Sequence, residues 1–160
     1  MHDTNGPDYV AFTSPVVFGV RLCSIAGMDA RELTAFAQRY TDAWNAHNAA
    51  ASAACYTEDG SLAINGGEPA QGRAAVQAVM QGFHDAFPGA VLTMDAIRGA
   101  GDRAVYLWTY EGTNTGPGGT GNRVRFSGWE AWTFAPSWLV QRSIGTFDQD
   151  EYERQLANGI

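Results

Sequence analysis

The sequence predicts an α+β domain, with helices in its first half and a curved, mainly antiparallel sheet in its second. Between residues 29 and 87 apolar residues recur every three or four positions, which indicates amphipathic helices. Between residues 90 and 147 they alternate every second position, which indicates strands. Such segregation is typical of the α+β class, and 160 residues suit one hydrophobic core.

The first helix is predicted over residues 29–47. Asp29 can cap it, and Glu32 stands three positions later, as in a capping box. Its apolar side chains share one face: Leu33, Phe36, Ala37, Tyr40, Ala43 and Trp44. A short alanine-rich helix is expected next, over residues 49–57.

A short strand over 62–65, closed by Gly66 and Gly67, precedes a third helix. This helix is predicted over 72–87, where Pro88 and Gly89 stop it.

Four long strands are then expected, with short connections rich in turn-forming residues. They are residues 90–99, 103–112, 123–134 and 138–147. Short connections between consecutive strands favour an antiparallel meander. We expect a final helix at 149–157, an N-terminal extension over 1–27 with a short strand near 16–22, and one domain over 28–160.

Charge and hydropathy exclude several classes of partner. The net charge is −7 and no run of Lys or Arg occurs, so neither nucleic acid nor an anionic membrane surface is an expected partner. No apolar run reaches the roughly 20 residues of a membrane span.

The cysteines and the motifs of the sequence bear on whether a cofactor is bound and on the cellular location. The two cysteines, Cys23 and Cys55, form no metal-binding spacing, and no nucleotide or zinc motif is present. We therefore expect no cofactor and no metal. Free thiols and the lack of a signal-peptide pattern favour a cytoplasmic location.

Three segments resemble the SnoaL-like branch of the cone-shaped, nuclear-transport-factor-two-like superfamily. They are residues 40–47 with 56–59, residues 72–73 leading to 87–89, and residues 112–117 with 125–128, followed by Asp148 and Gln155-Leu156. The superfamily includes polyketide cyclases, ketosteroid isomerase, epoxide hydrolases, dehydratases and proteins without catalysis. The resemblance implies a cone-shaped α+β barrel, a pocket for a small apolar molecule, and a homodimer formed through the sheet.

Tyr40 and Glu130 are the first candidate catalytic residues. Gln38-Arg39-Tyr40 is similar to the Gln-Arg-Tyr of ketosteroid isomerase, whose tyrosine is an oxyanion-hole donor. Glu130 stands where that enzyme has a protonated aspartate as the second donor, so an apolar pocket would keep it neutral. The alternative is that Glu130 faces outward, solvated or bonded across a dimer interface.

The sequence departs from the family at the expected acid/base aspartates. The cyclase aspartate falls at Ile144 or Gly145, and the isomerase base falls at Ile64-Asn65. His84 is then the best available general base, because histidine titrates near neutral pH. The alternative for His84 is a partly exposed histidine at the edge of the apolar stripe.

Five further residues are expected to bind substrate. Trp132 shares the strand face of Glu130, while Phe83 and Trp44 lie on helix faces directed to the core. Asn65 could bond a ligand carbonyl or simply form a turn. Asp148 could line the pocket mouth, although capping the last helix is the stronger interpretation.

The expected function is a cofactor-independent acid/base enzyme, an isomerase, cyclase or lyase. It would act on a small apolar, aromatic or polycyclic molecule through an enolate or phenolate-like intermediate. The alternatives are a non-catalytic small-molecule-binding module and an assembly protein that dimerises through its sheet.

Overall fold

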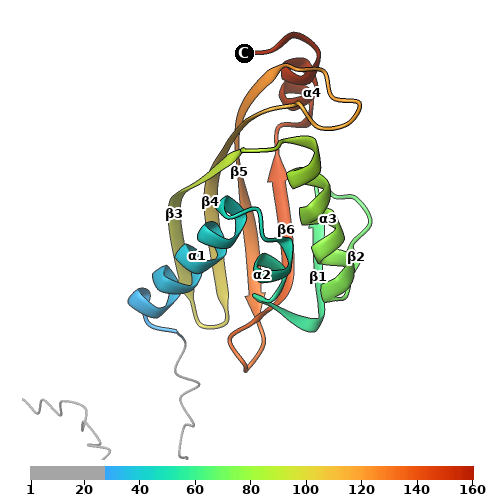
Figure 1. Ribbon diagram of the computed structural model, residues 1–160. Helices are drawn as coiled ribbons and strands as arrows, with labels where there is room; N and C mark the ends of the chain where they lie inside the picture. Colours follow the sequence, from blue (N-terminus) through green and yellow to red (C-terminus); the bar gives the residue numbers. More distant parts are fainter. Residues whose placement is uncertain (1–27) are drawn as a thin grey trace, which may run out of the picture.

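The computed structural model describes residues 28–160; the predicted N-terminal extension and its short strand lie outside these residues. Helices cover one face of a curved six-stranded sheet, which confirms the predicted cone-shaped α+β fold (Figure 1). The elements are α1 (Ala30–Asn45), α2 (Ala49–Ala53), β1 (Tyr56–Ile64), β2 (Ala70–Gln71), α3 (Arg73–Ala86), β3 (Val91–Ala100), β4 (Arg103–Thr113), β5 (Arg123–Phe134), β6 (Val140–Phe147) and α4 (Gln149–Asn158). The sheet order is β2-β1-β6-β5-β4-β3, so the sheet is not closed.

Helix α1 begins as its sequence predicts. The Asp29 side chain accepts hydrogen bonds from the backbone N–H groups of Arg31 and Glu32, and the Glu32 side chain accepts from the Asp29 N–H. This capping box satisfies three donors that the first turn would otherwise leave unpaired. The face directed at the sheet carries Tyr40 and, one turn later, Trp44.

Strand β1 is longer than predicted and replaces part of an expected helix. The expected helix over 49–57 ends at Ala53, and β1 begins at Tyr56 rather than at residue 62. The prediction was wrong because β1 pairs in parallel with β6, and this pairing overrides the helix propensity of the alanine-rich segment. Gly60 lies at the irregularity in that pairing, where a Cβ would come 2.9 Å from the Val140 carbonyl oxygen.

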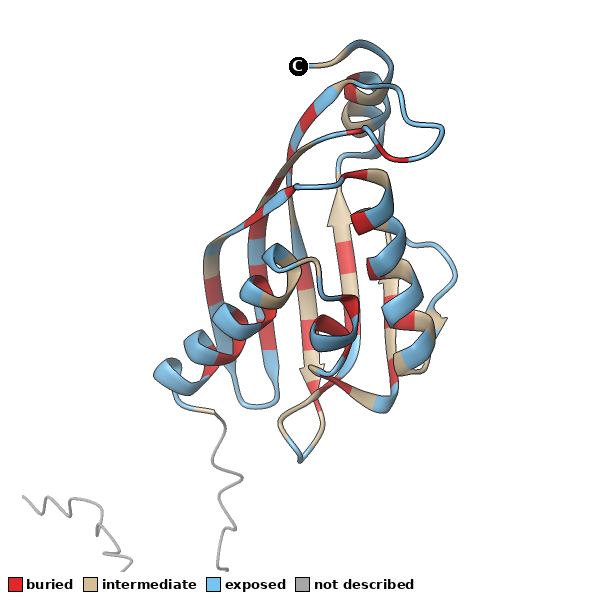
Figure 2. Ribbon diagram, viewed as in Figure 1, coloured by how far each residue is buried: buried red, intermediate tan, exposed pale blue. Residues whose placement is uncertain are grey.

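The predicted antiparallel meander is confirmed for β3 to β6. Buried and exposed residues alternate along its strands, so that one face lies against the helices (Figure 2). On the inner face Tyr106 lies opposite Glu130, and Glu130 lies opposite Gly145. The two-residue strand β2, which the sequence did not predict, pairs with β1 at the sheet edge.

The C-terminal helix packs at one end of the sheet. Gln155 is buried there; its side chain accepts from the Arg125 N–H and donates to the Arg125 carbonyl oxygen, which joins α4 to β5. Among the helices within residues 28–160, none is long and apolar enough to cross a bilayer.

Candidate functional site

A pocket opens between the inner face of the sheet and the helices α1 and α3. Its wall is largely aromatic and aliphatic, and Glu130 is the one acidic side chain among the described residues that form it. The lining residues are Tyr40, Trp44, Leu62, Ile64, Val79, Phe83, Leu92, Trp108, Tyr110, Phe126, Glu130, Gly145 and Phe147. The volume open to the centres of water molecules is about 60 Å³. Because one enclosed water needs roughly 10–15 Å³ on this measure, the space suits several waters or one small ring.

Glu130 is buried, with 8% of its surface exposed, and it accepts hydrogen bonds from four side chains. Its Oε2 accepts from Ser143 Oγ at 2.7 Å, Trp132 Nε1 at 2.9 Å and Tyr56 Oη at 3.3 Å. Its Oε1 accepts from Tyr40 Oη at 3.1 Å. Because the indole nitrogen can only donate, and hydrogen bonds to an ionised acceptor are the strongest, this arrangement stabilises a carboxylate.

The two tyrosines beside Glu130 remain protonated. Burial raises the pKa of Tyr40 well above its usual value, and the negative charge of Glu130 raises it further. The same two causes, in the same order, raise the pKa of Tyr56. Both phenols are therefore hydrogen-bond donors throughout the physiological pH range.

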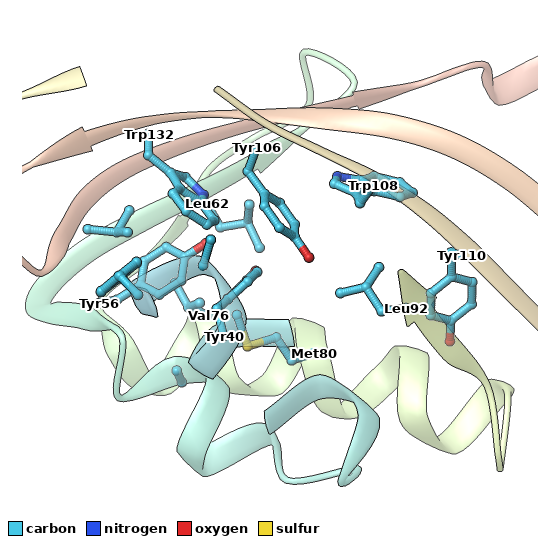
Figure 3. Packing of buried hydrophobic residues seen from close by; sticks show 14 of the residues in the cluster. Tyr40, Tyr56, Leu62, Val76, Met80, Leu92, Tyr106, Trp108, Tyr110 and Trp132 are labelled. Atoms are coloured by element: carbon cyan, nitrogen blue, oxygen red, sulfur yellow. The ribbon is translucent and has the colours of Figure 1, made fainter. Parts of the chain in front are cut away.

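An aromatic cluster packs around Glu130 and its hydrogen-bond donors, on the side away from the pocket. The Trp132 ring stacks on Tyr106, with centroids 4.9 Å apart and ring planes 11° apart, and meets Tyr40 edge to face. Tyr106 in turn shares a 2.7 Å hydrogen bond with the Thr41 hydroxyl of α1. Figure 3 shows Tyr106, Trp108, Tyr110 and Trp132 projecting from the sheet toward the helices. The rings leave little freedom for the carboxylate to move.

A family model described as the SnoaL-like domain matches residues 37–137, more than half of the chain. The chain belongs to this SnoaL-like domain family. None of the curated proteins matches the sequence.

Solved structures with the same fold extend over most of this SnoaL-like domain. TsrD from Streptomyces laurentii is 20% identical with a TM-score of 0.70, covering 81% of this chain and 97% of its own. The epoxide hydrolase/cyclase-like enzyme SalBIII, which has a role in pyran ring formation in salinomycin, is 16% identical with a TM-score of 0.66, covering 77% and 95%. A protein from Catenulispora acidiphila with a ketosteroid isomerase-like fold, in complex with trimethylamine, is 14% identical with a TM-score of 0.67, covering 75% and 90%. These likenesses, all below 25% identity, show the fold.

Two members of the Glu130 cluster were not among the residues singled out in the sequence. Tyr56 was placed in the expected short helix, and Ser143 was not considered. Ser143 could have been found, because two-residue alternation on its strand puts it on the same face as Gly145. Tyr56 required the parallel β1–β6 pairing, which no local pattern indicates.

The SnoaL-like domain does not place His84 on the pocket wall. His84 is on α3 with only 5% of its surface exposed, and neither ring nitrogen has a hydrogen-bond partner among the described residues. Its ring lies 5.0 Å from that of Trp44 and 4.9 Å from that of His47. Burial lowers the pKa of His84, and the neighbouring His47 lowers it further.

The other predicted binding residues divide into two groups. Phe83 and Trp44 line the pocket, whereas Trp132 lies behind it and donates to Glu130. Asn65 is outside the lining: it adopts the turn conformation at φ 50°, accepts from the Phe147 N–H and donates to Gln149.

Asp148 also has a structural contact. Its side chain caps α4 by accepting from the Glu151 N–H, and it is outside the lining of the pocket. Within residues 28–160 no group of three or more His, Cys, Asp or Glu is placed to hold a metal ion.

Proposed function

We propose that this chain is a cofactor-free acid/base enzyme, an isomerase, cyclase or lyase, acting on a small, largely apolar carbonyl or phenolic compound. The observation that carries the proposal is the buried pair of Glu130 and Tyr40 on the wall of an otherwise apolar pocket. A carboxylate on the wall of such a pocket is placed to exchange a proton with a bound molecule.

In this proposal Glu130, rather than His84, moves the proton. Oε2 accepts from all four donors, from Tyr40 at 3.4 Å, while Oε1 accepts from Tyr40 alone, at 3.1 Å. Oε1 is therefore the oxygen with capacity to take a proton. Neutral Glu130 as an oxyanion donor, which the sequence suggested, fits this donor-rich surrounding less well. His84 is not among the lining residues, so it has no assigned step.

The chemistry follows from this assignment. A C–H proton next to the substrate carbonyl passes to Glu130 Oε1, and the C–H electron pair forms the enolate, whose charge rests on the carbonyl oxygen. Where the substrate is a β,γ-unsaturated ketone, the enolate is a dienolate, and returning the proton from Glu130 to its γ-carbon moves the double bond and gives an isomer. Attack of the enolate carbon on a second carbonyl closes a ring, and the alkoxide that forms takes the proton from Glu130. Tyr40 remains protonated, so it can orient Oε1 or donate to the enolate oxygen.

Exchange of substrate hydrogen tests the proposal. We would follow deuterium incorporation next to the carbonyl of cyclohexanone in D₂O by NMR, with wild type, Glu130→Gln and Glu153→Gln. Glu153 is an exposed glutamate on α4 and serves as the matched control. Wild type and the control should accelerate exchange, and Glu130→Gln should lose about 10²-fold or more of the acceleration.

A non-catalytic binding module is the second candidate. Ile64 and Gly145 favour it, because both line the pocket at positions that the family resemblance matches to acid/base aspartates. Binding of the ketone without any protein-dependent exchange would support this candidate and reject the enzyme.

We further propose that the protein is a cytoplasmic homodimer. The outer face of the sheet carries Leu107 and Trp129, directly opposite each other and about 40% exposed, with Val105 on the same strand face as Leu107. Apolar side chains adjoining on one exposed sheet face favour contact with a second copy.

A further inference from the structure

Three hydrogen-bond donors on the pocket wall have no partner among the described residues. They are the indole nitrogens of Trp44 and Trp108 and the hydroxyl group of Tyr110, all shielded from bulk water. Native proteins leave few buried polar groups unpaired, because each such group loses its bonds to water and gains nothing in return. Three on one wall indicate that something else supplies the acceptor.

Among the described residues of this wall, the one charged acceptor already has its donors. Glu130 receives four side-chain hydrogen bonds, none of them from Trp108 or Tyr110. The two indole nitrogens can only donate, and the Tyr110 hydroxyl group can donate as well as accept, so a ligand that presents an acceptor oxygen satisfies all three.

The donors also lie at a defined distance along the sheet. Tyr106, Trp108 and Tyr110 follow one another on the inner face of β4 (Figure 3). Glu130 is opposite Tyr106 in the register. With a rise of about 3.4 Å per residue, Trp108 is attached roughly 7 Å along the strand from the Glu130 position, and Tyr110 roughly 14 Å. The absence of a side chain at Gly128 makes room for the Trp108 ring, since a Cβ there would lie 2.5 Å from that ring.

We propose that Trp108 and Tyr110 form an acceptor-binding end of the pocket, which holds the carbonyl or phenolic oxygen of a single-ring substrate while the ring carbon next to the one that carries this oxygen faces Glu130. The inference rests on the proposed function for the role of Glu130 and adds the substrate class. The small volume of the pocket favours one ring, because a polycyclic ligand would require it to widen.

An aromatic wall with one carboxylate could instead hold an alkylammonium ion against the ring faces. The unpaired donors argue against that ligand, because a cation leaves every N–H and O–H group on the wall unmet. Ammonium binding is therefore an outcome of the test rather than part of the proposal.

The test compares two ligands of the same shape. Cyclohexanone and methylenecyclohexane differ in carrying C=O or C=CH₂, and their affinities would be measured by calorimetric titration together with that of tetramethylammonium. A ketone oxygen costs free energy to remove from water, so the ketone binds more tightly than the hydrocarbon only where the protein donates to it. We expect the ketone to bind about ten-fold more tightly.

Tyr110→Phe keeps the ring and removes only the donor, so it should weaken ketone binding about three- to ten-fold and leave methylenecyclohexane binding unchanged. Trp108→Phe also removes one ring of the indole, so it is judged by the ratio of the two affinities, which should fall about three- to ten-fold. Trp129→Phe, on the outer face, is the control and should change neither. Tyr110→Phe removes only an unpaired group, so its thermal midpoint should not fall by more than a few degrees. Trp108→Phe also loses buried contacts, so circular dichroism checks that it folds.

Several outcomes would overturn the inference: equal affinity for ketone and hydrocarbon, equal losses for both ligands in the variants, tighter binding of tetramethylammonium, or no binding of the ketone. Its failure is separable from that of the proposed function. Ketone binding that depends on Trp108 and Tyr110, without hydrogen exchange, keeps the acceptor site and rejects the enzyme. Hydrogen exchange that depends on Glu130 but not on Trp108 and Tyr110 keeps the proposed enzyme and rejects the acceptor site.

Discussion

At the scale of single residues, the surroundings of Glu130 are the feature with the largest energetic consequence. A carboxyl group taken out of water is costly unless its oxygens find donors, and here four side chains from α1, β1, β5 and β6 supply them. The shortest of these bonds comes from Ser143. Removing one donor should thus lower the free energy of unfolding of the protein as well as change the pocket.

Ser143→Ala should lower the free energy of unfolding by about 1–3 kcal/mol, because it removes a buried hydrogen bond to an ionised acceptor. Ser127→Ala is the matched control: this serine lies on the exposed face of β5, bonded to Thr109, and its loss should cost less than about 0.5 kcal/mol. Urea denaturation of the two variants measures the difference, and equal costs would contradict the picture of Glu130 as a stabilised carboxylate.

His84 makes stability depend on pH. Its pKa is lower in the folded protein than the ordinary value near 6.5, so the unfolded chain binds the proton more tightly. Stability should therefore be highest above about pH 6.5 and fall as the pH drops below that value toward the lower folded-state pKa. In denaturant titrations from pH 7.5 to pH 5, His84→Gln should lose less stability than wild type; parallel pH profiles would refute this origin.

At the scale of elements, the parallel pair of β1 and β6 brings Tyr56 and Ser143 to Glu130. That pairing depends on Gly60, where a Cβ would lie 2.9 Å from the carbonyl oxygen of Val140 and 3.0 Å from that of Thr57. Backbone atoms cannot yield as the end of a side chain can, so the strand would have to shift.

Gly60→Ala should destabilise the protein by about 1–3 kcal/mol through this overpacking. Gly82→Ala, in the exposed interior of α3 with nothing within 4 Å of the added Cβ, should stabilise it by about 0.5–1 kcal/mol. Thermal and urea unfolding of the two variants should thus shift in opposite directions; a shift of the same sign would show that the β1 irregularity tolerates a side chain.

At the scale of the whole molecule, the two faces of the sheet differ in what covers them. The inner face and the helices enclose the pocket, while the outer face exposes Leu107 and Trp129. Leu107→Glu should convert the proposed dimer into a monomer in sedimentation equilibrium. Gln77→Glu adds the same charge on the exposed side of α3 and should leave the dimer intact; a monomeric wild type would remove the proposal.

The sequence by itself determined the helix and strand periods, the Asp29 capping box, the meander and the shared face of Glu130 and Trp132, because these depend on neighbours a few positions away. The family resemblance added the pairing of Tyr40 with Glu130, 90 positions apart, and the structure brings the two within hydrogen-bond distance.

Only the tertiary structure decided how the rest of the site is assembled. It turned the segment after Ala53 into a strand, brought Tyr56 and Ser143 to Glu130, and left His84 off the pocket wall. Local propensity cannot foresee these outcomes, because the free energy that chooses between helix and strand at Tyr56 comes from pairing with β6 and from burial against residues far along the chain.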